Sequence, residues 1–187
     1  MVQPKKIRLF IALKPDSVST TRILSLIRKL KRDYPGKFYR RDKLHLTLVF
    51  LGWVKQDNLN IIQEILRKDT ARFTPLRFQT ALLELHQKSK ERNHLWLKFE
   101  LSPSLKSFQT KLAQDLSKKG FQLEKRAFLA HLTLAQQIKT KQKISQVIKL
   151  RLNFRQLILY QSILSPKGSR YRAILTLPQN APISKTN

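Results

Sequence analysis

Two segments of the chain share the sequence HLTL. Residues 43–52 have the sequence KLHLTLVFLG, and residues 130–138 have the sequence AHLTLAQQI. The chain has only four histidines, and two of them, His45 and His131, open these two copies. The copies are separated by close to half of the 187 residues. This spacing predicts two similar halves rather than a solenoid of many short repeats.

Each HLTL copy is predicted to be a strand with one polar and one apolar face. Side chains alternate across a strand, so His45 and Thr47 are expected on one face and the intervening leucines on the other. The same alternation pairs His131 with Thr133. The leucines can then enter the core while each His-Thr pair faces away from it. If the two halves are related by a pseudo-twofold axis, both pairs can line one cleft.

Strands and helices are predicted along the rest of the chain. Apolar runs bounded by turn residues predict strands near residues 7–13, 44–51, 76–85, 95–101, 128–135, 154–164 and 171–177. Helical spacing predicts one helix that starts at a Ser17 cap and stops at Pro35-Gly36, and a second over residues 57–68. A third is capped by Ser102 or Ser104 and ends at Gly120, and a fourth, weaker helix is predicted over residues 141–150.

This mixed order of elements predicts an α+β fold with largely antiparallel sheets. No linker rich in Gly and Ser divides the chain. We therefore expect one two-lobed domain over residues 1–178, with helices outside the sheets, and a frayed tail over residues 179–187.

The net charge is strongly positive. There are 38 Lys and Arg residues against 11 Asp and Glu residues, which gives a formal net charge of +27. Such a field attracts polyanions, and nucleic acid is the commonest of these. The charge alone does not distinguish RNA from DNA or from an anionic membrane. A generally basic proteome or an adaptation for solubility would also account for it.

The chain contains no cysteine, which excludes disulfides and thiolate metal sites. The first apolar run is interrupted by Arg8 and stopped by Lys14 and Pro15, so it is too short to span a membrane. We expect a cytoplasmic protein without membrane association. No metal site is expected, because no His-Glu-x-x-His cluster is present either.

Two imidazoles across a cleft suit general acid–base chemistry. Histidine titrates near pH ~6.5, so one ring can be neutral while the other is protonated. One then takes a proton from water and the other gives a proton to a leaving oxygen. Threonine hydroxyls can bind non-bridging oxygens, so a phosphodiester is the substrate class that fits. His86 and His94 match no motif and are expected near a hairpin loop, outside this site.

Two H-x-T-x motifs in this order are the signature of the 2H phosphoesterase superfamily. Within it, the chain resembles the RNA 2′,3′-cyclic phosphodiesterases, also called 2′-5′ RNA ligases of the LigT/ThpR family. The resemblance covers most of the chain. It rests on RLFIALKPD at 8–16, LHLTLVFLG at 44–52, EKRAFLAHLTLAQ at 124–136 and LILYQSILSPKGSRYRAI at 157–174.

The resemblance implies a pseudo-symmetric fold and hydrolysis of an RNA terminal 2′,3′-cyclic phosphate to a 2′-phosphate. It implies no cofactor and no metal, and a reverse activity that joins RNA ends through a 2′-5′ linkage. His45 would be the proton donor and His131 the proton acceptor, although the sequence itself leaves these roles interchangeable. Thr47 and Thr133 would bind the phosphate. We expect a monomer that acts on RNA.

Two other functions stay open at this stage. One is an RNA-binding protein of the same fold with little turnover. The other is a 2H enzyme that acts on a small cyclic nucleotide, although such a substrate does not need a net charge of +27.

The chain departs from the family pattern at two positions. Ala130 replaces the usual proline before the second histidine, and Gln136 replaces an arginine near the phosphate. An amide supplies no charge and no bidentate fork. The candidates for the missing charge are Arg126, Arg170 and Arg172. We expect Arg170 or Arg172 rather than Arg126, because Arg126 lies an odd number of positions from His131 and would face away in an unbroken strand.

Overall fold

The strand pairings of the described residues are all antiparallel. The structure is a computed structural model, and it describes residues 5–71, 73–87, 93–124, 126–140, 142–166 and 168–178. The tail predicted at residues 179–187 lies outside these ranges. The strands are β1 Lys6–Pro15, β2 Lys37–Phe38, β3 Leu46–Lys55, β4 Leu76–Gln87, β5 Asn93–Lys98, β6 His131–Gln136, β7 Ser145–Ile163 and β8 Arg170–Leu177.

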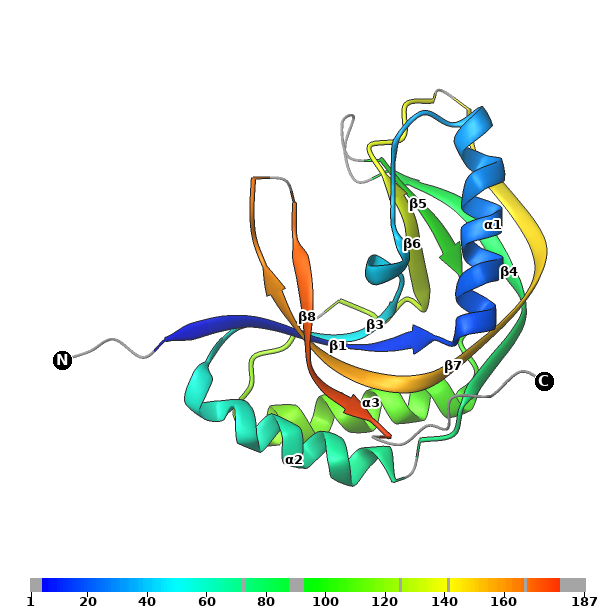
Figure 1. Ribbon diagram of the computed structural model, residues 1–187. Helices are drawn as coiled ribbons and strands as arrows, with labels where there is room; N and C mark the ends of the chain where they lie inside the picture. Colours follow the sequence, from blue (N-terminus) through cyan, green and yellow to red (C-terminus); the bar gives the residue numbers. More distant parts are fainter. Residues whose placement is uncertain are drawn as a thin grey trace.

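The strands form one sheet in the order β1-β3-β6-β5-β4-β7-β8, with β2 beside β6 and an additional pairing of β1 with β7. The long strand β7 makes this arrangement possible. Its first half pairs with β4 and its second half pairs with β1 and β8. Because β7 curves between these partners (Figure 1), the strands divide into two groups that are joined along β7. This is the α+β, two-lobed arrangement predicted, with one continuous sheet in place of separate ones.

Three α-helices occur in the described parts of the chain: α1 Ser17–Asp33, α2 Leu59–Thr70 and α3 Pro103–Lys118. Two short 3-10 turns precede β3 and α2, at Arg41–Lys43 and Gln56–Asn58. Helix α1 packs against β7 and β1, whereas α2 and α3 pack on each other and on β8 and β3 (Figure 1). None of these helices is long and apolar enough to cross a membrane, as far as the described residues go.

The helix ends follow from local capping chemistry. Asp16, not Ser17 as predicted, caps α1, because its carboxylate accepts a hydrogen bond from the backbone N–H of Ser19 at 2.7 Å. Ser102 caps α3 through the N–H of Leu105. Gly120 follows α3 with φ +83°, a conformation that glycine adopts without steric cost.

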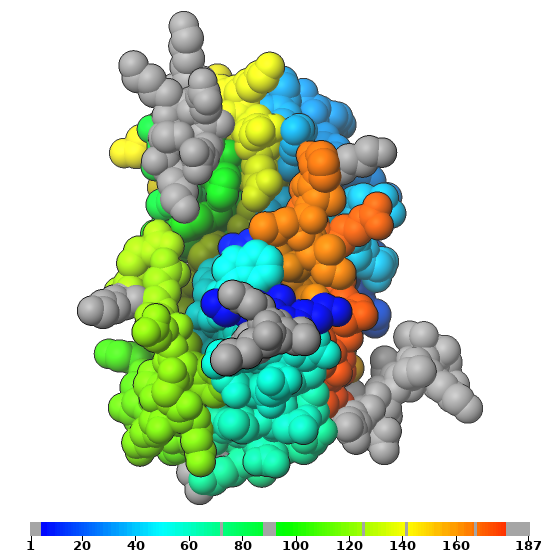
Figure 2. Space-filling view, turned by 90° about the vertical axis from the view of Figure 1, so that its left-hand side faces the viewer, coloured from blue at the N-terminus to red at the C-terminus, as the bar shows by residue number. Residues whose placement is uncertain are grey.

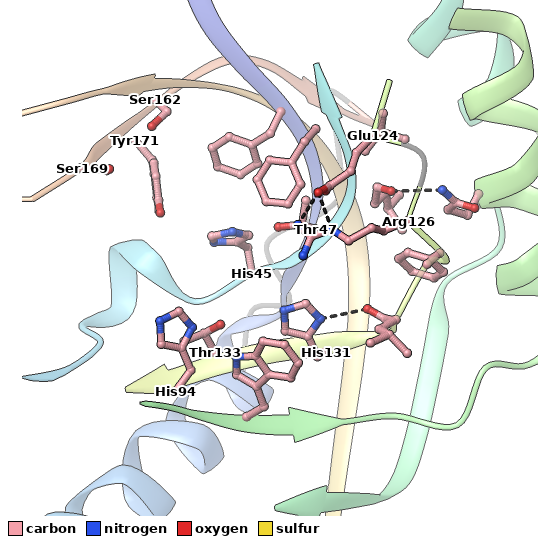
Figure 3. Close-up of a pocket in the computed structure, with 18 of the residues that line it drawn as sticks. His45, Thr47, His94, Glu124, Arg126, His131, Thr133, Ser162, Ser169 and Tyr171 are labelled. Carbon is pink, nitrogen blue, oxygen red and sulfur yellow. Dashed lines mark hydrogen bonds and ion pairs between the residues drawn. The ribbon is translucent and has the colours of Figure 1, made fainter. Parts of the chain in front are cut away.

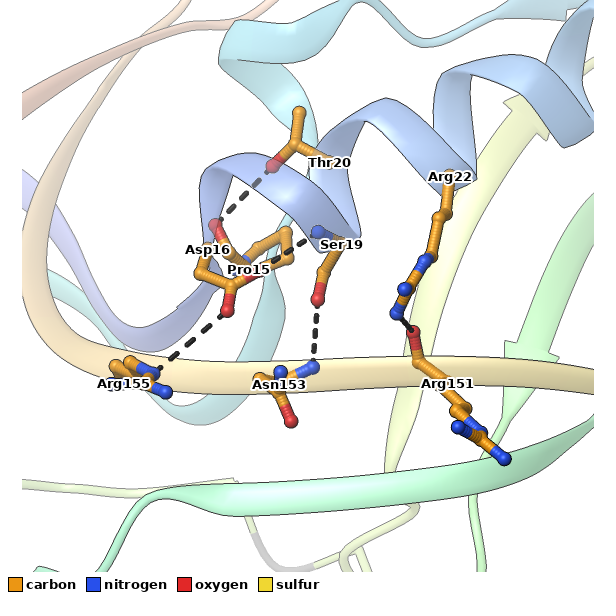
Figure 4. Close-up of polar contacts among 8 residues, drawn as sticks. All are labelled: Pro15, Asp16, Ser19, Thr20, Arg22, Arg151, Asn153 and Arg155. Atoms are coloured by element: carbon orange, nitrogen blue, oxygen red, sulfur yellow. Dashed lines mark hydrogen bonds and ion pairs between the residues drawn. The ribbon is translucent and has the colours of Figure 1, made fainter. Parts of the chain in front are cut away.

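Polar contacts fix the start of α1 on β7 (Figure 4). The N–H of Asn153 donates to the Ser19 hydroxyl at 2.8 Å, and the guanidinium of Arg22 donates to the carbonyl of Arg151 at 2.9 Å. Arg155 lies 3.8 Å from the carboxylate of Asp16. These contacts join residues more than a hundred positions apart and hold the first helix on the second half of the chain.

The fourth helix predicted over residues 141–150 is wrong. Residues 145–150 belong to β7, and residue 141 lies outside the described residues. Burial in this segment alternates: Ile148 and Leu150 are half-buried, whereas Val147 and Lys149 are exposed. That period of two is the period of a strand, and pairing with β4 stabilises it there.

Candidate active site

The two HLTL segments lie next to each other in the sheet. Strands β3 and β6 are antiparallel neighbours, and Leu46 of one is paired with Leu132 of the other. Continuing this register places His45 across from Thr133 and Thr47 across from His131. The arrangement is the pseudo-twofold relation that the sequence predicts for the two copies.

The two faces of these strands have the predicted polarity. Leu46, Leu48, Leu132 and Leu134 are buried in the main core. The histidines and threonines between them are half-buried on the opposite face. The prediction of one polar and one apolar face per copy is therefore confirmed.

A cavity of about 540 Å³ lies over this polar face. His45, Thr47, His131 and Thr133 all line it, and Figure 3 shows their side chains gathered around it. The other lining residues used below are Arg8, Phe10, Lys43, Phe50, His86, His94, Trp96, Glu124, Arg126, Leu129, Gln136 and Tyr171. The cavity thus combines two halves of the chain, as a cleft between two lobes should.

Both histidines are held by the same backbone contact. Nδ1 of His45 lies 2.8 Å from the carbonyl oxygen of Lys43, and Nδ1 of His131 lies 2.9 Å from that of Leu129. A carbonyl only accepts, so Nδ1–H is the donor in each ring. In the neutral form, Nε2 then has the lone pair, and it is the atom that exchanges a proton with a substrate.

Aromatic rings surround His45. Its ring centroid lies 5.0 Å from that of Phe10 and 5.2 Å from that of Tyr171, which meets it edge-on. Burial of the ring lowers the pKa of His45 to about 4. The hydrogen bond to the carbonyl of Lys43 acts in the opposite direction, and the charge of a protonated His131 lowers this pKa further. The free protein therefore holds His45 neutral near pH 7.

His131 belongs to a stack of three rings. Its ring lies 4.0 Å from that of Trp96, and Trp96 lies 3.8 Å from His86 on its other side. Burial lowers the pKa of His131, against the hydrogen bond to the carbonyl of Leu129, and the positive charges of His86 and Lys98 lower it further. The two imidazoles of the site are thus both less basic than a free histidine.

His86 and His94 lie beside the β4–β5 hairpin, as expected, but they are not remote from the cavity. They face each other across the β4–β5 hairpin, and both line the cavity. The reason is the alternation within β5, which puts His94 on the same face as Trp96. The alternation itself can be read from the sequence NHLWL. What the sequence does not specify is that β5 pairs with β6, which brings His94 and Trp96 beside the second HLTL segment.

The three candidate arginines differ in their access to the cavity, and not in the way expected. Arg126 lines the cavity, because it lies in the loop before β6 and strand alternation does not apply to it. Arg170 and Arg172 are exposed on β8, and the residue between them, Tyr171, lines the cavity instead. Arg172 donates to the amide oxygen of Gln161 at 2.7 Å.

The cations that line the cavity are only in part the expected ones. Gln136 lines the cavity, as do the cations Arg8, Lys43 and Arg126. Arg126 forms an ion pair with Glu124, which also lines it (Figure 3). Arg8 and Lys43 were missed by sequence reasoning, which had no signal that β1 and the turn before β3 border the same cavity. In the described parts of the chain, no group of three or more His, Asp or Glu side chains is placed to hold a metal ion.

Comparisons with known proteins identify the family and relatives of this chain. The family model described as the 2′-5′ RNA ligase superfamily matches residues 15–157. A protein of Archaeoglobus fulgidus named RNA 2′,3′-cyclic phosphodiesterase is 26% identical over 172 residues, which cover 88% of this chain and 96% of that protein. A protein of Thermotoga maritima with the same name is 25% identical over 174 residues, which cover 89% and 92%.

Among solved structures, that of E. coli LigT complexed with 3′-AMP is similar to this one with a TM-score of 0.69 and 22% sequence identity. The alignment covers 92% of this chain and 97% of that chain. This likeness confirms the two-lobed fold over nearly its whole length.

Proposed function

The chain belongs to the 2′-5′ RNA ligase superfamily, and from this membership we propose that it is an RNA 2′,3′-cyclic phosphodiesterase that leaves a 2′-phosphate. One observation supports this best: the two His-Thr pairs lie opposite each other on the neighbouring strands β3 and β6, and both pairs line the same cavity. Two relatives that share the proposed name align over most of this chain. The proposal includes a single catalytic domain over residues 1–178 and a monomeric, cytoplasmic enzyme.

The proposed reaction is an in-line displacement at phosphorus. Nε2 of His131 accepts a proton from water while the water oxygen bonds to phosphorus. The bond from phosphorus to the 3′-oxygen breaks, and Nε2 of His45 donates the proton that this oxygen needs. The product has a 2′-phosphate and a free 3′-hydroxyl. Thr47 and Thr133 donate hydrogen bonds to the non-bridging oxygens, where negative charge increases in the transition state.

A 5′-hydroxyl of RNA in place of water would complete the same steps as a ligation. The 5′-oxygen would bond to phosphorus, the 3′-oxygen would leave, and the joined strand would have a 2′-5′ linkage. We include this as a second reaction of the same site, in keeping with the superfamily's name.

The donor role of His45 sets a requirement on the substrate. With a pKa of about 4 in the free protein, His45 is protonated in only a small fraction of molecules near neutrality. A bound phosphodiester anion favours the protonated form, because an opposite charge within a few ångströms raises the pKa of an imidazole. Binding of the anionic substrate thus favours the protonated form of His45 that the reaction needs. Because its pKa is low, protonated His45 transfers its proton readily.

We therefore expect two different bell-shaped pH profiles. Activity falls at low pH when the acceptor becomes protonated and at high pH when the donor loses its proton. Both pKa values lie below 6.5 in the free protein, so the kcat/KM profile should be centred below pH 6.5. The kcat profile reports the substrate complex and should be centred at higher pH. Coincident profiles centred near or above pH 6.5 would contradict the burial argument.

The decisive experiment uses RNA with a terminal 2′,3′-cyclic phosphate in the presence of excess EDTA. We expect turnover to continue, because the proposed steps are proton transfers between side chains and substrate. The product end should be a 2′-phosphate, identified by its resistance to enzymes that remove only 3′-phosphates. Loss of activity in EDTA that zinc or manganese restores would refute this mechanism.

A parallel assay with 2′,3′-cyclic AMP separates the alternatives. Faster hydrolysis of the mononucleotide than of RNA would favour an enzyme for small cyclic nucleotides. Binding of RNA without turnover of either substrate would favour an RNA-binding protein of the same fold.

Arg126 should supply part of the charge that Gln136 lacks. We expect Arg126→Ala to lower kcat/KM by the equivalent of about 1–3 kcal/mol of transition-state stabilisation, the scale of hydrogen bonds to charged groups. The same change in a Gln136→Arg background should cost much less, since the new guanidinium takes over. Arg172→Ala, at an exposed position bonded to Gln161, is the matched control and should have no effect. Equal losses in both backgrounds would show that Arg126 does not compensate for Gln136.

A further inference from the structure

The polar face of the site continues along β1 and β3 beyond the cavity. The register pairs Phe10 with Phe50, Arg8 with Trp53, and Lys6 with Lys55. Residues that are directly opposite in an antiparallel pair share a face, and Lys6, Arg8 and Phe10 are two apart along β1. These six residues therefore lie on one face, which we call the β1–β3 strip. Phe10, Phe50 and Arg8 of this strip also line the cavity.

A β-bulge builds this strip. Phe50 and Trp53 are three positions apart, so a regular strand would point them to opposite faces. The register shifts between Leu9 and Phe10, whose partners are Gly52 and Phe50, and this leaves Leu51 as the extra residue. Gly52 has φ +65°, which suits a glycine at such a bulge. The bulge turns Trp53 to the side of Phe50, while Leu51 and Val54 stay in the core.

Two large aromatic side chains are exposed on the strip. Trp53 is 62% exposed and Phe50 is 47% exposed. The ring of Phe50 lies 6.0 Å from that of Phe10, which in turn lies 5.0 Å from His45. An aromatic path thus leads from the candidate proton donor to the surface. In Figure 2, the blue and cyan residues of this part of the chain are at the surface, between the yellow-green and the orange parts.

The charged residues of the strip are all cations: Lys6, Arg8 and Lys55. Alternation of exposed aromatic rings with cations is the chemistry that binds single-stranded nucleic acid, because bases stack on the rings and phosphates pair with the cations. From Thr47 to Trp53 the strand extends roughly 20 Å. That length exceeds what a mononucleotide in the cavity needs, and the net charge of +27 favours a polyanion.

We propose that the β1–β3 strip is a subsite for the single-stranded RNA immediately 5′ of the reacting end. One base stacks on Phe50 and a preceding base stacks on Trp53, while Lys6, Arg8 and Lys55 neutralise the phosphates between them. The 5′ direction follows from chemistry, because a terminal 2′,3′-cyclic phosphate leaves the chain only one way to continue. This proposal rests on the proposed function, and it adds that the substrate is an unpaired strand and not an isolated nucleotide.

The test compares two substrates and three variants. kcat/KM is measured for an RNA oligonucleotide that ends in a 2′,3′-cyclic phosphate and for 2′,3′-cyclic AMP, and the ratio of the two values is the readout. We expect Trp53→Ala to lower this ratio by about 5- to 100-fold, the range found for loss of one stacked base. Trp53→Phe, which keeps an aromatic face, should restore most of it. Val147→Ala on β7 removes an equally exposed apolar side chain away from the cavity and should leave the ratio unchanged.

Direct binding separates failure of this proposal from failure of the proposed function. The affinity for single-stranded RNA without a cyclic end is measured as a function of salt, for the parent and for Lys6→Ala/Lys55→Ala. We expect the double variant to have a shallower dependence of log K on log salt, by about one unit if one to two phosphate contacts are lost. This result, together with weaker RNA binding by Trp53→Ala, would support the subsite even if neither substrate were hydrolysed.

Two outcomes would overturn the proposal. In the first, Trp53→Ala leaves both the substrate ratio and the RNA affinity unchanged. In the second, the salt dependence is the same for the parent and the lysine variant. Either result would mean that the exposed aromatic residues serve another partner, such as an acidic protein surface, and that RNA leaves the cavity by a different path.

Discussion

Replacing either His45 or His131 by alanine is expected to lower kcat/KM on cyclic-phosphate RNA by about 10²-fold or more, the usual scale for a positioned acid or base. Each ring is proposed to make a different proton transfer at Nε2, and each is fixed through Nδ1 by its own backbone carbonyl. Single-turnover rates at saturating enzyme would measure the chemical step without interference from product release.

Binding should survive both changes, since RNA affinity comes mainly from phosphate contacts with cations. The double variant should be little slower than the single ones, because donor and acceptor act in the same turnover and their losses are not additive. Each variant should also lose one side of the bell-shaped pH profile. Alanine in place of the proton acceptor removes the fall in activity at low pH, and alanine in place of the proton donor removes the fall in activity at high pH. Near wild-type rates in either single variant would refute the two-histidine mechanism.

The side of the pH profile that each variant loses would also show which histidine is the proton donor. The resemblance assigns this role to His45, whereas its aromatic surroundings make it the ring with the pKa of about 4 in the free protein. If His45→Ala removed the low-pH fall instead, the two roles would have to be exchanged. The geometry permits either assignment, because each Nε2 borders the same cavity and each ring has the same kind of carbonyl partner.

The parts of the structure that could be predicted from sequence are those that depend on local periodicity. HLTL has a period of two, and only its leucines can enter a core, so the faces of His45 and His131 followed from the chain alone. Helices α1 and α3 were predicted for a similar reason, because caps and stops are local signals. The helix predicted over residues 141–150 was wrong because Ile144, Val147 and Ile148 also fit a helical spacing. Only the pairing with β4 decides between helix and strand in this segment.

The residues missed at the site depend on contacts between distant strands. Trp96 stacks on His131 because β5 pairs with β6, and Tyr171 reaches His45 because β8 joins β7 beside β1. Neither pairing can be predicted from alternation within one strand. The direction of the Arg126 side chain was predicted by strand alternation, but β6 begins only at His131, so Arg126 lies outside the strand. A shift of a strand end by a few residues decides whether alternation applies to the residues beside it.

Replacing Leu132 by alanine is expected to reduce both stability and catalysis. Leu132 is fully buried and lies opposite Leu46, where the two HLTL strands meet. Loss of a fully buried leucine side chain costs about 2–5 kcal/mol in free energy of unfolding, from lost burial and from the cavity that remains. Urea denaturation would measure this change, with an unchanged m-value as the sign that the variant still unfolds in one step.

The catalytic effect distinguishes this leucine from other core residues. Leu132 lies between His131 and Thr133, so a cavity beneath it lets β6 shift against β3, and a displacement of about 1 Å can cost 10²-fold in rate. Leu66→Ala on α2 is the matched control, since Leu66 is also buried but does not line the cavity. It should lose similar stability yet keep its rate per folded molecule. Equal rates in the two folded variants would show that the β3–β6 contact stabilises the fold without setting the distance between the two histidines.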